Sequence, residues 1–255
     1  MTSSQFFIRK TDIHPPHAFL GGEEHHHLKM VLRARAGDKV SLFDEEGLRY
    51  RAVVERSDKD RTVLRIEEII KEERSAIEIT LAQSLLKAPA MEFVFQKATE
   101  LGASAVIPVQ ARRSVVRMEG RAAKKIERWR RIVLEAAKQC KITFPPDILP
   151  LATVEHLVEE RRDAVRLLLS ENRGRMLREI LVEEGPQSLR GERATLKSAP
   201  LSVLLVVGPE GGWEPDEEAF LLGGGFKAVS LGKNILRAET ASLAGLAMIF
   251  HFWNG

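Results

Sequence analysis

The sequence predicts an α/β protein in which a small β-rich domain precedes a larger domain built on a parallel sheet. The chain has 255 residues, enough for two domains that each have a hydrophobic core. Short alternating strand patterns fill its first part, and strands that alternate with helical patterns fill the rest. The second pattern is typical of a parallel sheet that helices cover on both faces.

The first domain is expected over residues 1–72. Residues 39–43 and 50–54 have the composition of two strands joined by a turn, and residues 61–70 alternate again. The charged residues 71–75 follow and mark a boundary. The second domain is therefore expected over residues 73–255.

The second domain begins with a strand and a helix. Residues 77–81 alternate like a strand, and Pro89 then opens a segment with helical spacing that ends at Gly102. Residues 105–109 form another short apolar run. The apolar positions from Ala122 to Cys140, which include Trp129, recur every three or four residues and predict one buried helix face.

Two further strands are expected at residues 165–169 and 203–207. The second is almost entirely apolar, as expected of a strand that is covered on both faces. Residues 183–200 are rich in Gly, Ser, Arg and Pro and are predicted to form a surface loop.

The composition excludes several classes of protein. Hydrophobic residues make up 44% of the chain, but no apolar stretch is long enough to cross a bilayer. The amino-terminal residues lack the basic and apolar segments of a secretion signal. The single Cys140 excludes an internal disulfide, so we expect a cytoplasmic protein.

Basic residues are locally concentrated although the net charge is only +3. One cluster runs from Lys29 through Arg33 and Arg35, and another contains Arg112, Arg113 and Arg117. Such clusters are compatible with a nucleic-acid surface and equally with an ordinary solvated surface. Charge alone leaves both interpretations open.

A glycine-rich loop at residues 208–212 follows the apolar strand and precedes a helix that begins near Pro215. Ligands of parallel sheets bind at the carboxyl ends of strands, and glycines allow the backbone to approach a ligand closely. The glycine spacing matches neither the dinucleotide fingerprint nor the P-loop. A tight connection without a ligand is the alternative.

A second loop follows the strand that ends at Leu231 and Gly232, and a long apolar helix then runs from Glu239 to Trp253. Arg237 and Glu239 flank the entrance of this helix. A glutamate suits the positive end of the helix dipole, so Glu239 is either a functional residue or a simple cap.

These segments resemble the SPOUT methyltransferases. Residues 208–212, 231–232 and 235–241 resemble the last motifs of that family. The similarity covers nearly the whole chain: residues 6–8, 27–33 and 37–40 resemble a PUA-like domain, and residues 96–102, 113–116 and 135–139 resemble the catalytic domain. Several motifs in the same order are far more specific than any one of them.

The resemblance implies a trefoil knot in the second domain that holds S-adenosylmethionine as methyl donor. It further implies methylation of N3 of a uridine in 16S ribosomal RNA of the small ribosomal subunit, by a homodimer. The residues expected to bind the donor are Val206, Gly208, Glu210, Gly211, Gly212, Leu231, Gly232, Ile235, Leu236, Thr240 and Ala241.

Arg237 and Glu239 are the expected catalytic residues. A guanidinium stabilises negative charge that develops on the uracil oxygens, and Glu239 orients Arg237 or accepts the proton. The basic clusters then become an RNA surface formed by Arg33, Arg35, Arg112, Arg113 and Arg117.

Metal binding and covalent catalysis are not expected. The side chains of His25, His26 and His27 diverge on any regular element, and no spaced set of ligands completes a site. Cys140 falls on the apolar stripe of its helix and is expected to be buried rather than nucleophilic.

The sequence departs from the family pattern at Lys233 and Asn234, at residues 139–142 and at residues 87–90. Two alternatives stay open. One is an enzyme of the same superfamily that methylates another RNA, and the other is a non-catalytic RNA-binding or assembly factor that kept the fold.

Overall fold

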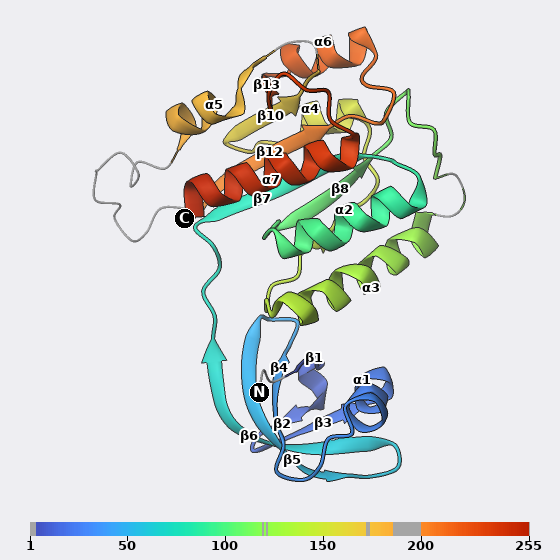
Figure 1. Ribbon diagram of the computed structural model, residues 1–255, viewed down its shortest axis with the longest axis vertical. Helices are drawn as coiled ribbons and strands as arrows, with labels where there is room; N and C mark the ends of the chain where they lie inside the picture. Colours follow the sequence, from blue (N-terminus) through green and yellow to red (C-terminus); the bar gives the residue numbers. More distant parts are fainter. Residues whose placement is uncertain (1–3, 119, 121, 172–173, 186–199, 255) are drawn as a thin grey trace. The chain divides into compact units, whose positions relative to one another are not determined.

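The computed structural model describes residues 4–118, 120, 122–171, 174–185 and 200–254 (Figure 1). The chain divides into two units. The first combines Met1–Arg74 with Leu134–Pro145, and the second combines Ser75–Val133 with Pro146–Gly255. The first unit therefore takes a segment from the middle of the chain, which the domain bounds expected from the sequence do not include.

The first unit is built on a six-stranded sheet, as the β-rich sequence pattern predicts. Only the terminal pair of strands, β1 and β4, is parallel, and the other neighbours are antiparallel. Phe6, Leu42, Tyr50 and Leu64 form part of its buried core. In order across the sheet the strands are β1 (Gln5–Phe7), β4 (Lys39–Phe43), β5 (Leu48–Ser57), β6 (Arg61–Lys71), β3 (His17–Gly21) and β2 (Ile13–His14).

Short helical segments interrupt this sheet, where the sequence indicated only strands. They are η1 (Lys10–Asp12), α1 (Gly22–His26) and the π-helical turn η2 (His27–Val31). Segments of this length contain too few turns to show a helical period. Within α1, His25 is buried and its Nδ1 lies 2.8 Å from Oγ1 of Thr62, whereas His26 is exposed.

The second unit is built on a seven-stranded sheet in which every pair of neighbours is parallel. This confirms the predicted α/β class and agrees with the SPOUT type of sheet. In order the strands are β11 (Arg175–Met176), β13 (Lys227–Ser230), β10 (Val165–Leu169), β12 (Leu201–Val207), β7 (Ile77–Ser84), β8 (Ala105–Val109) and β9 (Asp147–Ile148).

Helices cover both faces of this sheet (Figure 1). Along β12, Val203 and Leu205 pack into one core while Leu204 and Val206 pack into the other. This alternation explains why the strand is apolar throughout. One core includes residues of α2 (Ala88–Glu100), α3 (Ala122–Cys140), α5 (Leu177–Glu184) and α7 (Ala238–Asn254), and the other includes residues of α4 (Val154–Glu160) and α6 (Pro215–Gly223).

The structure corrects two expectations. Trp129 is buried as predicted and stacks on Phe95 with ring centroids 4.7 Å apart, but Cys140 is exposed. The helix ends at Cys140, beyond the part of its face that packs into the core. The predicted loop at residues 183–200 is also wrong at its start, because α5 continues to Glu184; residues 186–199 lie outside the described residues.

No helix within the described residues is both long enough and apolar enough to cross a bilayer.

Candidate functional site

A cavity of about 760 Å³ opens at the carboxyl ends of neighbouring strands in the second unit. Its walls include Leu169 at the end of β10, Val207 at the end of β12 and Ser230 at the end of β13. A volume of this size suits a ligand with the dimensions of a nucleoside derivative. The cavity lies where the strand-end rule places ligands in parallel sheets.

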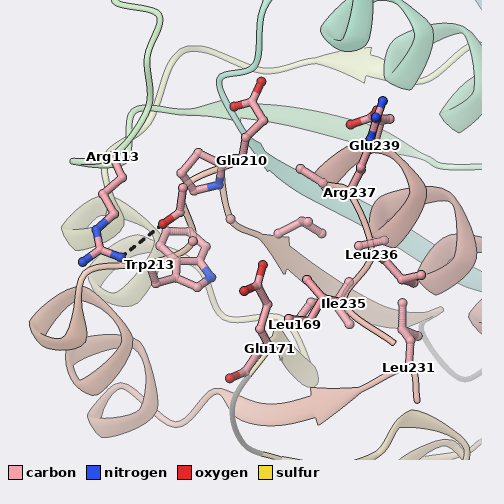
Figure 2. A pocket seen from close by; sticks show the side chains of 18 of the residues that line it. Arg113, Leu169, Glu171, Glu210, Trp213, Leu231, Ile235, Leu236, Arg237 and Glu239 are labelled. Atoms are coloured by element: carbon pink, nitrogen blue, oxygen red, sulfur yellow. Dashed lines mark hydrogen bonds between the residues drawn. The ribbon is translucent and has the colours of Figure 1, made fainter. Parts of the chain in front are cut away.

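Most of the residues expected to bind a donor line this cavity (Figure 2). Val206 and Thr240 do not line it: Val206 is fully buried in the sheet core, and Thr240 is exposed on α7. The expected donor residues that do line it are Gly208, Glu210, Gly211, Gly212, Leu231, Gly232, Ile235, Leu236 and Ala241.

Other lining residues were missed by sequence reasoning. Ser170 and Glu171 follow β10, and Lys87 follows β7, so the strand-end rule would have found them. Trp213 and Glu218 carried no such signal, because they lie beyond the glycine-rich loop and in α6.

Glycines shape both loops. Gly212 has a φ of +69° and Gly232 a φ of +144°, values that residues with a β-carbon rarely adopt. A β-carbon at Gly208 would lie 3.0 Å from Nε1 of Trp213, so the glycine lets the indole pack closely against the backbone. The loops therefore need glycine for conformation at two positions and for space at a third.

Polar groups on one wall of the cavity include an unsatisfied donor. Nε1 of Trp213 is buried and has no hydrogen-bond partner among the described residues. Nearby in the lining, the hydroxyl of Ser170 donates to a carboxylate oxygen of the buried Glu218 at 2.6 Å. A buried N–H without a partner is costly, so packing against Gly208, and not a hydrogen bond within the described residues, holds this indole.

The lining combines an apolar surface with charges of both signs. Figure 2 shows Leu231, Ile235 and Leu236 together on one loop and Glu210 on the other. The remaining charged lining residues are Glu171, Glu218 and Glu239, with Lys87, Arg113, Lys233 and Arg237. Such a cavity suits a ligand that has an apolar ring system and both cationic and anionic groups.

The start of α7 brings Arg237 and Glu239 to the edge of the cavity. Both lie at the same end of the pocket in Figure 2. This turn is anchored below by a buried contact in which the hydroxyl of Ser242 donates to Oε1 of Gln83 on β7. The two expected catalytic residues thus share a rigidly held helix start.

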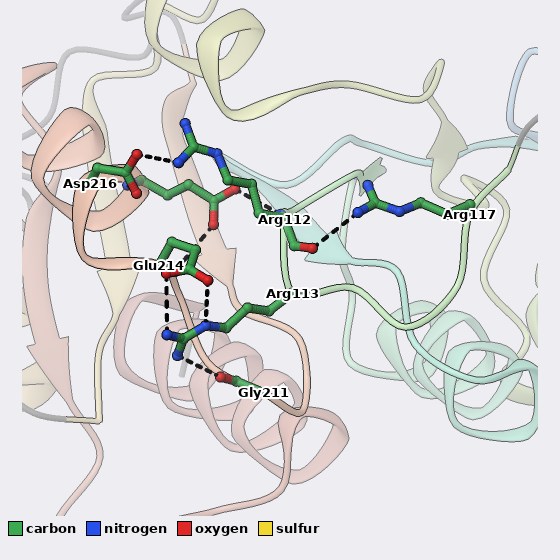
Figure 3. A network of polar contacts seen from close by, with 7 residues as sticks. Arg112, Arg113, Arg117, Gly211, Glu214 and Asp216 are labelled. Atoms are coloured by element: carbon green, nitrogen blue, oxygen red, sulfur yellow. Dashed lines mark hydrogen bonds and ion pairs between the residues drawn. The ribbon is translucent and has the colours of Figure 1, made fainter.

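The arginines expected to bind RNA fall into two groups. All five are exposed, and Arg33, Arg35 and Arg117 form no ion pair within the described residues. Arg112 and Arg113 instead form ion pairs with carboxylates at the start of α6 (Figure 3).

These ion pairs shift the pKa values of Arg112, Arg113 and Asp216. The hydrogen bond from Arg112 lowers the pKa of Asp216, and Asp216 in turn raises the pKa of Arg112. The hydrogen bond to Glu214 likewise raises the pKa of Arg113. Both arginines are therefore already engaged by carboxylates of their own unit.

No group of three or more His, Cys, Asp or Glu side chains that could hold a metal ion is found in the part of the chain that the structure describes.

Comparisons with known proteins define the class of this fold and site. A family model described as an RNA methyltransferase domain matches residues 73–250, and a model described as an RNA methyltransferase PUA domain matches residues 20–67. The first match spans the whole described cavity.

Individual relatives give the same result. The chain is 34% identical to the ribosomal RNA small subunit methyltransferase E of Bacillus subtilis, over 89% of this chain and 87% of the relative. A solved ribosomal RNA small subunit methyltransferase E from Neisseria gonorrhoeae, bound to S-adenosyl methionine, is 30% identical with a TM-score of 0.83 and 98% of both chains covered. A methyltransferase from Legionella pneumophila, in complex with the bound cofactor SAM, is 27% identical with a TM-score of 0.83, covering 98% of this chain and 97% of that chain.

The chain belongs to the RNA methyltransferase family that these ribosomal RNA small subunit methyltransferase E proteins represent.

Proposed function

We propose that this chain binds S-adenosylmethionine in the cavity and transfers its methyl group to N3 of a uridine in 16S ribosomal RNA of the small subunit. The observation that carries the proposal is the pair of glycine-shaped loops that line one cavity at the strand ends. Relatives with this fold were solved with the donor bound. We further propose a cytoplasmic homodimer with domains over residues 1–72 and 73–255.

The cavity residues fit this donor. Leu231, Ile235 and Leu236 offer apolar surface for a purine ring. The lining glutamates complement the sulfonium and ammonium charges, and the lining cations complement the donor carboxylate.

Bound in the cavity, the donor supplies an electrophilic methyl group on a sulfonium. The task of the protein is then to align the uracil nitrogen with that methyl and to exclude water. Uracil N3 becomes nucleophilic as its proton leaves, and negative charge develops on the ring oxygens. We propose that Arg237 stabilises this charge and that Glu239 orients Arg237 or accepts the proton.

The RNA surface is proposed to include Arg33, Arg35 and Arg117, whose exposed guanidinium groups can contact phosphates. Arg112 and Arg113 could contact a phosphate only by giving up the carboxylates that they already contact.

Methyl transfer from labelled S-adenosylmethionine tests the proposal. The acceptors are isolated small subunits, isolated large subunits and total RNA from cells that lack the gene, and mass spectrometry identifies the modified nucleoside. We expect N3-methyluridine confined to small-subunit RNA. Another nucleoside or another RNA would retain the enzyme class and contradict the substrate, whereas no transfer together with no donor binding would favour the non-catalytic factor.

A further inference from the structure

A loop between β8 and α3 contacts the glycine-rich loop through Arg113 and the start of α6 through Arg112 (Figure 3). We name residues 110–117 the arginine loop and residues 208–214 the donor loop. The two loops are about a hundred residues apart in sequence, so neither hydrophobic pattern nor motif spacing indicates that they meet.

Arg113 makes the central contact. Its Nε lies 2.9 Å from Oε1 of Glu214, its Nη2 lies 3.2 Å from Oε2 of the same carboxylate, and its Nη1 donates to the carbonyl oxygen of Gly211 at 3.1 Å. The guanidinium therefore holds two points of the donor loop at once. This forked geometry is available to arginine and not to lysine.

Arg112 adds a second connection. Its backbone N–H donates to Oε1 of Glu217 at 2.9 Å, and its guanidinium pairs with Asp216. Because Glu217 also accepts from the backbone N–H of Glu214 at 3.2 Å, one carboxylate links the arginine loop to the last residue of the donor loop.

The arginine loop is itself held firmly. Ala111 and Ser114 are buried, and the backbone N–H of Ser114 donates to the carbonyl of Ala111 at 3.1 Å, which leaves Arg112 and Arg113 pointing outward from a tight turn. The side-chain amide of Gln110 donates to the carbonyl of Val116 at 3.2 Å. Arg113 therefore contacts the donor loop from a fixed base.

We propose that Arg113 is a positioning residue that fixes the donor loop in its ligand-binding shape, an inference that rests on the proposed donor site. Arg113 and Gly211 both line the cavity, and a β-carbon at Gly211 would touch the Arg113 side chain at 3.4 Å. An exposed ion pair contributes little to global stability, so the effect of this contact falls on the loop rather than on the fold. Arg113 thereby acts on donor affinity and not on RNA affinity.

The test measures donor and RNA binding separately in the intact chain. Titration calorimetry gives the dissociation constant for S-adenosylmethionine, and filter binding at several salt concentrations gives the affinity for small-subunit RNA. The variants are Arg113→Ala, Arg113→Lys and Glu214→Gln, with Arg117→Ala as matched control for donor binding alone, because Arg117 belongs to the proposed RNA surface. Arg117 belongs to the same loop, but its guanidinium donates to the carbonyl of Arg112 at 3.1 Å.

We expect Arg113→Ala to weaken donor binding by roughly two- to fivefold, the range expected when an exposed charged contact that holds a loop is lost. Arg113→Lys should give an intermediate loss, because a single ammonium cannot hold both contacts. Combining Arg113→Ala with Glu214→Gln should add little to the loss in Arg113→Ala, since that substitution already removes the pair with Glu214. In steady state the donor KM should rise while kcat at saturating donor stays nearly constant.

An unchanged donor dissociation constant in Arg113→Ala, together with weaker RNA binding and a shallower salt dependence, would identify Arg113 as a phosphate contact and overturn the proposal. An equal loss of donor affinity in Arg117→Ala would also overturn it. If Arg113→Ala fails to fold, the donor and RNA dissociation constants of Arg113→Lys and Glu214→Gln distinguish the positioning role from a phosphate contact. Failure of the unaltered protein to bind the donor would reject the donor site itself, and the positioning role with it.

Discussion

Replacing Ser242 with alanine removes the buried contact that anchors the start of α7. Both Ser242 and Gln83 are fully buried, and the serine hydroxyl has two acceptors in reach, Oε1 of Gln83 and the carbonyl oxygen of Ala238 at 2.9 Å. The Gln83 amide nitrogen donates elsewhere, to the carbonyl of Ser84 at 3.0 Å, so the substitution leaves Oε1 without this donor. A buried acceptor that loses its partner costs about 1–3 kcal/mol.

Urea unfolding monitored by tryptophan fluorescence reports on the second structural unit, which contains Ser242. All three tryptophans, Trp129, Trp213 and Trp253, lie in the second unit. With an m-value near 2 kcal/mol/M, the midpoint of Ser242→Ala should fall by roughly 0.5–1.5 M. The double variant Gln83→Leu/Ser242→Ala should recover most of the loss, because it removes both polar partners and keeps a side chain of similar size.

A loss below about 0.5 kcal/mol for Ser242→Ala would show that Gln83 is satisfied in another way. A double variant less stable than Ser242→Ala alone would contradict the same reasoning, since it would mean that the glutamine makes a further essential contact.

The other predictions concern single residues. Arg237→Ala should lower kcat by roughly a hundredfold, as expected when a group that stabilises the developing negative charge is lost. The affinity for S-adenosylmethionine should stay within about twofold of that of the unaltered protein. An equal loss of S-adenosylmethionine binding would refute the catalytic assignment. Gly232→Ala should weaken donor binding because its φ is +144°, whereas Gly37→Ala, at a φ of +94° in the first unit, should leave donor calorimetry unchanged. Burial raises the pKa of Tyr50, the only tyrosine, and the hydrogen bond to Asp44 raises it further. Phenolate absorbance should therefore appear near pH 10 in the urea-unfolded chain but not in the native protein. A midpoint near pH 10 in the native protein would contradict this prediction.

The tyrosine titration also has a consequence for stability. Because the pKa of Tyr50 is raised in the folded state, the stability that the protonated phenol contributes is fully present below its ordinary value near 10. That contribution is lost as the pH rises from about 10 through the folded value.

The sequence carried enough information to predict β7, β8, β10, β12 and β13 of the second unit and both glycine-containing loops that line the cavity, but not the two-residue strands β9 and β11. The apolar run of β12 follows from burial on both faces, and the glycines at 208, 212 and 232 follow from close packing and positive φ. Each of these features depends on local composition, which a sequence displays directly.

What the sequence could not display depends on contacts between distant segments. From the sequence alone, Arg112 and Arg113 have no evident ion-pair partner, because their carboxylate partners lie about a hundred residues further along the chain. Cys140 kept the helical period of a buried residue although the core ends before it. The helical turns at residues 22–31 are too short to produce a period at all.

The measurement that tests the central claim most directly is the amount of N3-methyluridine in 16S ribosomal RNA from cells that lack the gene. We predict that the modified nucleoside disappears on deletion, returns with the intact gene, and does not return with the Arg237→Ala variant. Unchanged N3-methyluridine after deletion would contradict the proposed reaction, and full restoration by Arg237→Ala would contradict the proposed site.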